Sequence, residues 1–128
     1  FSTMGFQAPA CTSSAGKCLL AALSGEELKR RFAHYSFVKS TSKSIENFEQ
    51  LHRQLQQVRK RGWATNENEY AENLSSIGAP IYDYNGDVVA AICFGGNSIH
   101  FLPENIAQLS VIVLDTALSV SKKLGYLP

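Results

Sequence analysis

The first residues whose types and spacing could do chemistry lie at positions 13–17, which read Ser-Ser-Ala-Gly-Lys. The segment ends in the Gly-Lys pair of phosphate-binding loops. The full spacing Gly-x-x-x-x-Gly-Lys-Ser/Thr is absent, because no glycine stands five residues before Gly16 and Cys18 replaces the hydroxyl that would bind magnesium. Small residues at a helix start still leave backbone N–H groups open to a carboxylate or a phosphate. The segment therefore predicts either an anion site or an ordinary helix cap.

Candidate nucleophiles and metal ligands are scattered along the chain. The three cysteines, Cys11, Cys18 and Cys93, form no Cys-x-x-Cys pair, which argues against a disulfide framework or a zinc site. The histidines are His34, His52 and His100. Cys93 lies among small apolar residues, which favours packing or pocket lining over an activated thiolate. We therefore expect no catalytic residue, no metal and no cofactor, and free cysteines are typical of a reducing cytoplasm.

The charge balance argues against nucleic-acid binding by this part of the protein. Twelve Lys and Arg against eleven Asp and Glu leave a net charge of +1, too little for the attraction to phosphate that DNA binding needs. The basic residues 59–61 end a predicted helix, where cations stabilise the free carbonyl groups. Trp63 and Tyr70 adjoin an acidic run at positions 67, 69 and 72 that would repel phosphate.

Four helices are predicted around these residues. Hydroxyl residues at 12–14 can cap a helix that continues to Leu23, and residues 24–27, Ser-Gly-Glu-Glu, form a capping box for a second. Apolar residues spaced by three and four between Ile45 and Val58 predict a third helix, which Gly62 ends. The fourth starts at Pro103. Its apolar stripe comprises Ile106, Leu109, Val113, Ala117, Val120 and Leu124.

Two antiparallel strands are predicted at residues 77–84 and 88–94, on either side of Asn85-Gly86, a pair that readily takes the positive φ angles of a tight hairpin turn. Pro80 cannot donate a ladder hydrogen bond, so its strand should lie at a sheet edge or be bulged there. Helices, a hairpin and a further helix predict an α+β fold with an antiparallel sheet. With 128 residues, 45% of them hydrophobic, we expect one soluble domain over 1–128 with no membrane contact.

Four motifs occur in one order: Ser-Ser-Ala-Gly-Lys-Cys-Leu-Leu-Ala at 13–21, Leu-x-x-Val-Arg-x-Arg-Gly-Trp at 55–63, Glu-x-Glu-Tyr at 67–70 and Ile-Gly-Ala-Pro-Ile-Tyr-Asp at 77–83. With Leu-Pro-Glu at 102–104, this set resembles the C-terminal effector-binding domain of IclR-type bacterial transcription regulators over residues 9–125. The resemblance implies a GAF-like, profilin-like antiparallel sheet flanked by helices. It also implies an N-terminal winged helix-turn-helix domain and first sensor strands that lie outside this chain, which begins without methionine.

The resemblance further implies which residues contact a small organic acid or sugar acid. The backbone N–H groups of Ser14 and Ala15 match those that hold the effector carboxylate in relatives. The other positions that match the lining of the pocket are Asn66, Leu74, Ser76, Cys93, Gly95 and Ala8, with Ala8 in the place of an apolar wall residue. A pocket with an apolar wall and a few converging polar groups suits a small ligand.

This chain departs from the family pattern at several of these positions. Relatives commonly have Asp at Asn66, Gly at Asn73, Cys at Ser76 and Ser at both Cys93 and Gly95. An amide at 66 removes a repulsive charge and supplies a donor, which makes an anionic or hydroxylated ligand easier to accommodate. We therefore expect an effector that differs from those of better-known relatives.

We expect this protein to be a metabolite sensor rather than an enzyme. The full-length protein would be a homodimer or homotetramer that binds DNA through its N-terminal domain and represses a catabolic operon. Two alternatives remain open on the sequence: a small cytosolic enzyme that uses Cys93, and a GAF-like interaction module without a ligand. Loss of turnover in Cys93→Ser would favour the enzyme.

Overall fold

The computed structural model describes residues 4–128, and its three strands form one antiparallel sheet in the order β1-β2-β3. The helices are α1 (Ser14–Ala21), α2 (Gly25–Phe32), α3 (Phe48–Arg61) and α4 (Pro103–Lys123), with short 3-10 helices η1 (Ala10–Thr12) and η2 (Ser98–His100). The strands are β1 (Ala64–Glu67), β2 (Leu74–Tyr82) and β3 (Val88–Asn97). The predicted α+β class with an antiparallel sheet is confirmed.

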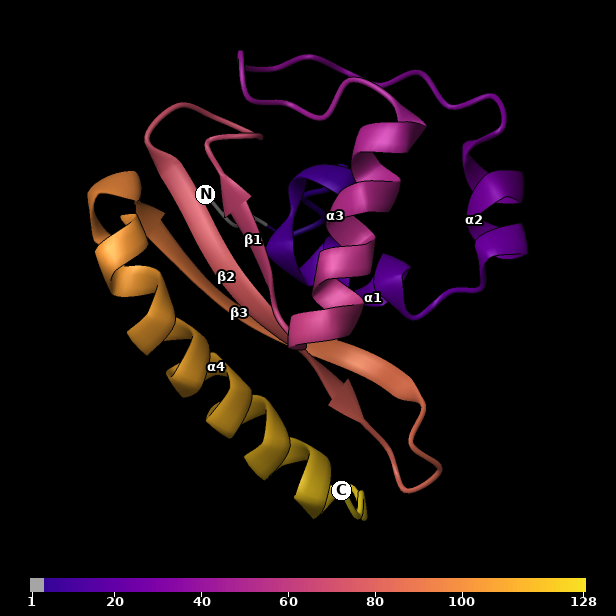
Figure 1. The fold of residues 1–128 in the computed structure, drawn as a ribbon, viewed down its shortest axis with the longest axis vertical. Helices are drawn as coiled ribbons and strands as arrows, with labels where there is room; N and C mark the ends of the chain where they lie inside the picture. Colours follow the sequence, from indigo (N-terminus) through magenta and orange to yellow (C-terminus); the bar gives the residue numbers. More distant parts are fainter. Residues whose placement is uncertain (1–3) are drawn as a thin grey trace.

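Side chains along β2 point alternately to the two faces of the sheet, and different helices cover these two faces. Ile77, Ala79 and Ile81 are buried against Val113 and Ala117 of α4. On the other face, Ala64 of β1 packs with Cys18 of α1 and Val58 of α3. Figure 1 shows α4 along one side of the sheet, with α1 and α3 on the other. The even-numbered residues of β2 therefore face α1.

A layer of three helices forms beside the sheet. Leu20 of α1, Leu28 of α2, and Leu51 and Leu55 of α3 are buried together. The predicted caps of the first two helices form, since the side chains of Ser13 and Ser24 accept from backbone N–H groups. The expected capping box is only half formed, because the Glu27 carboxylate accepts from Arg30 and Arg31 instead of from a backbone N–H.

The hairpin between β2 and β3 forms with a different turn from the predicted one. Of the Asn85-Gly86 pair, Gly86 has a positive φ of 81°, whereas Asn85 does not. Asp83 and Asp87 close the loop through the Asp83 N–H and the Asp87 carbonyl oxygen. Three residues, rather than two, therefore make the turn, and the Asp83 side chain stabilises it by accepting from the N–H groups of Asn85 and Asp87.

Pro80 lies in the central strand rather than in an edge strand, and the structure shows why it is tolerated there. Strand β1 begins at Ala64, which pairs with Gly78, so no residue of β1 lies opposite Pro80. The register also shifts between Ile81 and Tyr82. The missing N–H of Pro80 thus removes no bond to a neighbouring strand on that side.

Helix α4 begins at Pro103 as predicted, and its apolar stripe packs on the sheet except at Leu124, which is exposed. The buried Ser121 hydroxyl donates to the Ala117 carbonyl oxygen at 2.8 Å and accepts from the Tyr82 N–H at 2.9 Å. This hydroxyl ties the end of the helix to β2. Within residues 4–128, no helix is both long and apolar enough to cross a membrane.

Candidate functional site

The start of α1 carries two backbone donors that bond to none of the residues that the structure describes. The Gly16 N–H donates to the Ser13 hydroxyl at 3.2 Å, and the Lys17 N–H donates to the Ser13 carbonyl oxygen at 2.9 Å. Within residues 4–128, the N–H groups of Ser14 and Ala15 have no acceptor. A helix N-terminus with free donors attracts anions. The sequence left open a cap or an anion site here, and the structure contains both a cap and two free donors.

Gly16 allows this helix start to form where it does. A Cβ on Gly16 would lie 2.3 Å from the Ala10 carbonyl oxygen, so a larger residue would push η1 away from α1. The close approach holds the segment before the helix against its first turn.

The strand register brings the expected side chains to the sheet face beneath α1. Asn66 of β1 lies opposite Ser76 of β2, and Ser76 lies opposite Gly95 of β3. The neighbouring rows pair Gly78 with Cys93 and Leu74 with Asn97. Directly paired residues of antiparallel strands point to the same face. Five of the residues implied by the family resemblance, Asn66, Leu74, Ser76, Cys93 and Gly95, therefore share one face.

Ser14 joins this face from above. Its side chain is fully buried, and its hydroxyl oxygen accepts from the Ser76 hydroxyl at 2.8 Å. A Cβ on Gly78 would lie 3.2 Å from the Ser14 Oγ and 3.1 Å from the Cys93 Cβ. Ser14, Cys93 and the Ile92 carbonyl oxygen thus surround the bare backbone of Gly78.

Asn66 supplies a further unused donor. The residue is only 5% exposed, and its Oδ1 accepts from the Glu69 N–H at 3.0 Å. Its Nδ2 donates to none of the residues that the structure describes. The bond from Glu69 sets the orientation of the amide, so Nδ2 is the group left to meet a ligand.

Four of the residues implied by the resemblance lie around the edge of this group. Leu74 and Gly95 line a cavity of about 530 Å³ with the loop between β1 and β2. Ala15 is half-buried, and Ala8 is exposed in the segment that precedes α1. Phe6, in the same segment, contacts the Tyr70 ring edge-to-face, with ring centroids 6.2 Å apart. The segment therefore passes near the β1–β2 loop.

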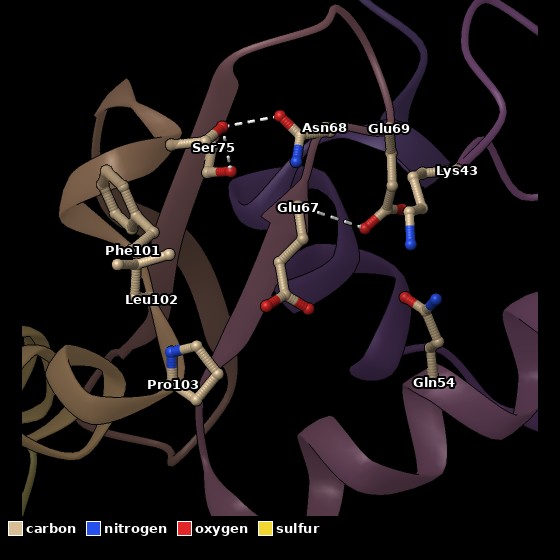
Figure 2. Close-up of a pocket in the computed structure, with 10 residues that line it drawn as sticks. Lys43, Gln54, Glu67, Asn68, Glu69, Ser75, Phe101, Leu102 and Pro103 are labelled. Carbon is tan, nitrogen blue, oxygen red and sulfur yellow. Dashed lines mark hydrogen bonds between the residues drawn. The ribbon is translucent and has the colours of Figure 1, made fainter.

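A second cavity, of about 400 Å³, lies at the free edge of β1 and contains none of the predicted residues. In Figure 2 the Glu67 side chain stands in its centre, with Gln54 and Lys43 on one side and Leu102 and Pro103 on the other. Glu69, at its rim, forms an ion pair with the Lys17 ammonium at 2.6 Å. Burial lowers the pKa of Lys17, and the Glu69 carboxylate partly offsets that effect.

Sequence reasoning missed the Lys17–Glu69 pair. It treated Lys17 as part of an incomplete phosphate loop and Glu69 as one of three solvated acids. The two residues lie 52 positions apart in sequence, so no local pattern connects them. The only available signal was a lysine within an otherwise small and apolar helix.

The family profile described as "Bacterial transcriptional regulator IclR C-terminal" matches residues 1–122. The chain belongs to the IclR family. It corresponds to the C-terminal effector-binding domain of these regulators. The HTH-type transcriptional repressor AllR of Klebsiella pneumoniae is 31% identical over 125 residues, which cover 98% of this chain and 46% of AllR.

Two solved structures show how closely this IclR-family domain follows known folds. The repressor BlcR of Agrobacterium tumefaciens matches with a TM-score of 0.92 and 32% identity, over 99% of this chain and 51% of BlcR. A double mutant of the PobR inducer-binding domain from Acinetobacter, in complex with 3-hydroxybenzoic acid, matches with a TM-score of 0.85 and 22% identity, over 93% of this chain and 69% of that one. The second likeness shows the fold alone.

This IclR-family domain spans about half the length of AllR and BlcR. The matching relatives named here are transcription regulators, which argues against the alternative of an enzyme that uses Cys93. The identity of the contact residues stays a prediction, supported by the geometry beneath α1.

Proposed function

We propose that this domain senses a small organic acid or sugar acid, bound between the start of α1 and the facing strands. The observation that carries the proposal is the pair of N–H groups at Ser14 and Ala15, which have no acceptor among residues 4–128, at the helix start that the Ser14–Ser76 hydroxyl bond joins to β2. Two convergent N–H groups and a helix N-terminus suit a carboxylate. The lining residues would be Ser14, Ala15, Asn66, Leu74, Ser76, Cys93, Gly95 and Ala8.

The polar groups define the class of ligand further. Beyond the carboxylate, Asn66 Nδ2 offers a donor to a second oxygen, and the Ser76 hydroxyl lies in the same row of the sheet. The cavity lined by Leu74 and Gly95 offers an apolar wall and space for a carbon chain or ring. The complex of PobR with 3-hydroxybenzoic acid supports this class, because that ligand combines a carboxylate with a hydroxyl on the same fold.

In the full-length protein, the bound acid would alter DNA binding. An N-terminal winged helix-turn-helix domain would contact the operator, and the effector domains would assemble as a homodimer or homotetramer. A ligand that binds one arrangement of this assembly more tightly than another shifts the population toward it. We infer a repressor that releases a catabolic operon when its acid accumulates. AllR and BlcR, which are repressors, support this direction.

A thermal-shift screen tests the proposal. The purified domain is heated with glyoxylate, 2-oxo acids, aldonic and uronic acids and hydroxybenzoates. An acid at about 100 times its dissociation constant adds about 2.7 kcal/mol to the free energy of unfolding, which corresponds to several degrees in a domain of this size. Absence of a shift with every acid, in both the domain and the full-length protein, would contradict the sensor function and favour the ligand-free module.

A matched pair of variants tests whether any thermal shift arises from binding at this site. Cys93 is exposed on the sheet face beneath α1, so Cys93→Trp should fill the site and abolish the shift. Val89, also exposed on β3, lies away from the serine and asparagine row, so Val89→Trp should retain it. Equal shifts in both variants would place the ligand elsewhere.

A further inference from the structure

The free edge of β1 is occupied by side chains instead of by another strand. Among the residues that the structure describes, β1 pairs only with β2. The Asn68 N–H donates to the Leu74 carbonyl oxygen at 3.1 Å, just beyond the strand. In an antiparallel ladder, alternate residues bond to the partner. Asn66 and Ala64 therefore bond toward β2, and the backbone groups of Thr65 and Glu67 point away from it.

Lys17 and Glu69 bond to two of those outward groups. The Lys17 ammonium donates to the Thr65 carbonyl oxygen at 2.8 Å, and the Glu67 N–H donates to the Glu69 carboxylate at 3.2 Å. Lys17 also donates to both oxygens of Glu69, at 2.6 and 2.8 Å. Lys17 and Glu69 are 1% and 5% exposed. A buried ion pair thus closes the strand edge and connects it to α1.

Glu69 also holds the surroundings of the site through its main chain. Its N–H donates to the Asn66 Oδ1, which orients the amide, and its carbonyl oxygen accepts from the Ser44 hydroxyl at 2.7 Å. The Thr41 hydroxyl donates to the preceding carbonyl oxygen, that of Asn68, at 2.5 Å. One residue therefore connects α1, β1, the Asn66 side chain and the segment before α3.

We propose that Lys17 and Glu69 are positioning residues, which pin the first turn of α1 to the edge of β1 and so place the donors of Ser14 and Ala15 over Ser76 and Asn66. Lys17 lies one helical turn after Ser14, so a shift at its ammonium displaces those donors directly. This inference rests on the proposed function, because the position of those donors matters only if they bind an acid. The contacts between α1 and β1 stand independently of it.

The positioning role of Lys17 and Glu69 can be tested apart from their contribution to stability. Replacing a buried ion pair by apolar residues of similar volume often leaves stability unchanged, whereas removing one partner leaves a buried charge and destabilises strongly. The double variant Lys17→Met/Glu69→Met should therefore fold. It loses the two bonds to Thr65 and Glu67, because methionine neither donates nor accepts effectively at these positions.

Hydrogen exchange on the folded double variant provides the first measurement. Amide exchange in α1 and β1 should rise at least about tenfold, while exchange in α4 should stay unchanged, because only the edge contacts are lost. The matched control is Glu27→Met/Arg30→Met, which removes an exposed ion pair and should leave α1 and β1 unaltered. The single variant Lys17→Arg keeps a cation at this position. It should therefore retain most of the wild-type protection of the amides in α1 and β1. Unchanged exchange in the double variant would overturn the inference.

Binding provides the second measurement, with whichever acid of the thermal-shift panel binds the wild-type domain most tightly. The dissociation constant should rise at least about tenfold in the double variant, because the donors are no longer preorganised. Tight binding by the wild type and equal binding by the variant would refute the positioning role alone. Failure of the wild type to bind any acid would refute the proposed function, and the exchange measurement would still decide whether the ion pair positions α1.

Discussion

The Ser76 hydroxyl donates to the Ser14 hydroxyl across 2.8 Å and joins the central strand to the first turn of α1. Ser14 is fully buried and Ser76 is half-buried. Beside them lie Gly78, which has no side chain, and the free N–H groups of the helix start. The proposed acid would bind at this contact.

The Ser14–Ser76 bond should show measurable coupling. We expect the single changes Ser14→Ala and Ser76→Ala to lower the free energy of unfolding, and the double change to cost about 0.5 to 1.5 kcal/mol less than their sum, because the bond is lost only once. Urea unfolding of the four proteins measures this coupling. Ser24→Ala, in a distant helix cap, should add to Ser76→Ala without coupling. A coupling near zero would mean that the hydroxyls do not bond in solution.

Gly78 should not tolerate a side chain, whereas Gly96 should. A methyl group at Gly78 would meet Ser14 Oγ and Cys93 Cβ, but at Gly96 it would meet nothing within 4 Å. Gly78→Ala should cost about 1 to 3 kcal/mol and weaken acid binding, since the methyl group crowds the space between Ser14 and Cys93. Gly96→Ala should change neither property. Equal stability and affinity in the two variants would show that Gly78 does not form the floor of a site.

Cys93 should be the reactive thiol. It is exposed, whereas Cys11 and Cys18 are buried and burial raises the pKa of each. A disulfide reagent at about pH 8 should modify one thiol per folded chain and three after unfolding, because thiolate fraction and access control the reaction. Cys93→Ser should remove the fast reaction. A bound acid should slow it, and an acid that raises the melting temperature without slowing it would bind away from Cys93.

Cys18 should make the fold less stable at alkaline pH. Burial raises its pKa from 9.0 to about 12, so the folded protein keeps a proton that the unfolded chain loses. The free energy of unfolding should therefore fall as the pH rises from about 9 toward 12. Urea midpoints compared between wild type and Cys18→Ala isolate this contribution from those of the tyrosines and lysines. A parallel decline in both proteins would contradict the prediction.

Ser121 should contribute more to stability than its neighbour on the helix, Ser119. The Ser121 hydroxyl bonds to Ala117 and to the Tyr82 N–H, so Ser121→Ala leaves that N–H without its acceptor and should cost about 1 to 3 kcal/mol. Ser119 is exposed, and Ser119→Ala should be nearly neutral. Chemical denaturation measures both. Similar losses would indicate that the bond to β2 is not formed.

The elements that local patterns specify were predictable from the sequence. Ser13, Ser24 and Gly62 act as helix caps in the structure, and the apolar stripe of α4 packs on the sheet. The fold class and family also followed from ordered motifs. Two predictions were wrong because the same local pattern fits more than one arrangement. Asn-Gly occurs in several turn types, and Asn85 does not take a positive φ. The Glu27 carboxylate accepts from nearby arginines instead of completing the capping box. Strand β1 has only four residues, too few for a periodic pattern.

The sequence by itself determined the helices, the hairpin and the capped start of α1, because caps, turns and apolar periodicity act between residues a few positions apart. Only the tertiary structure decided that Ser14 meets Ser76, that Asn66, Ser76 and Gly95 form one row, and that Lys17 pairs with Glu69. Lys17 and Glu69 lie 52 positions apart in the sequence, and Ser14 and Ser76 lie 62 positions apart. Helix packing against the sheet brings such residues together, and this packing depends on contacts between residues far apart in sequence.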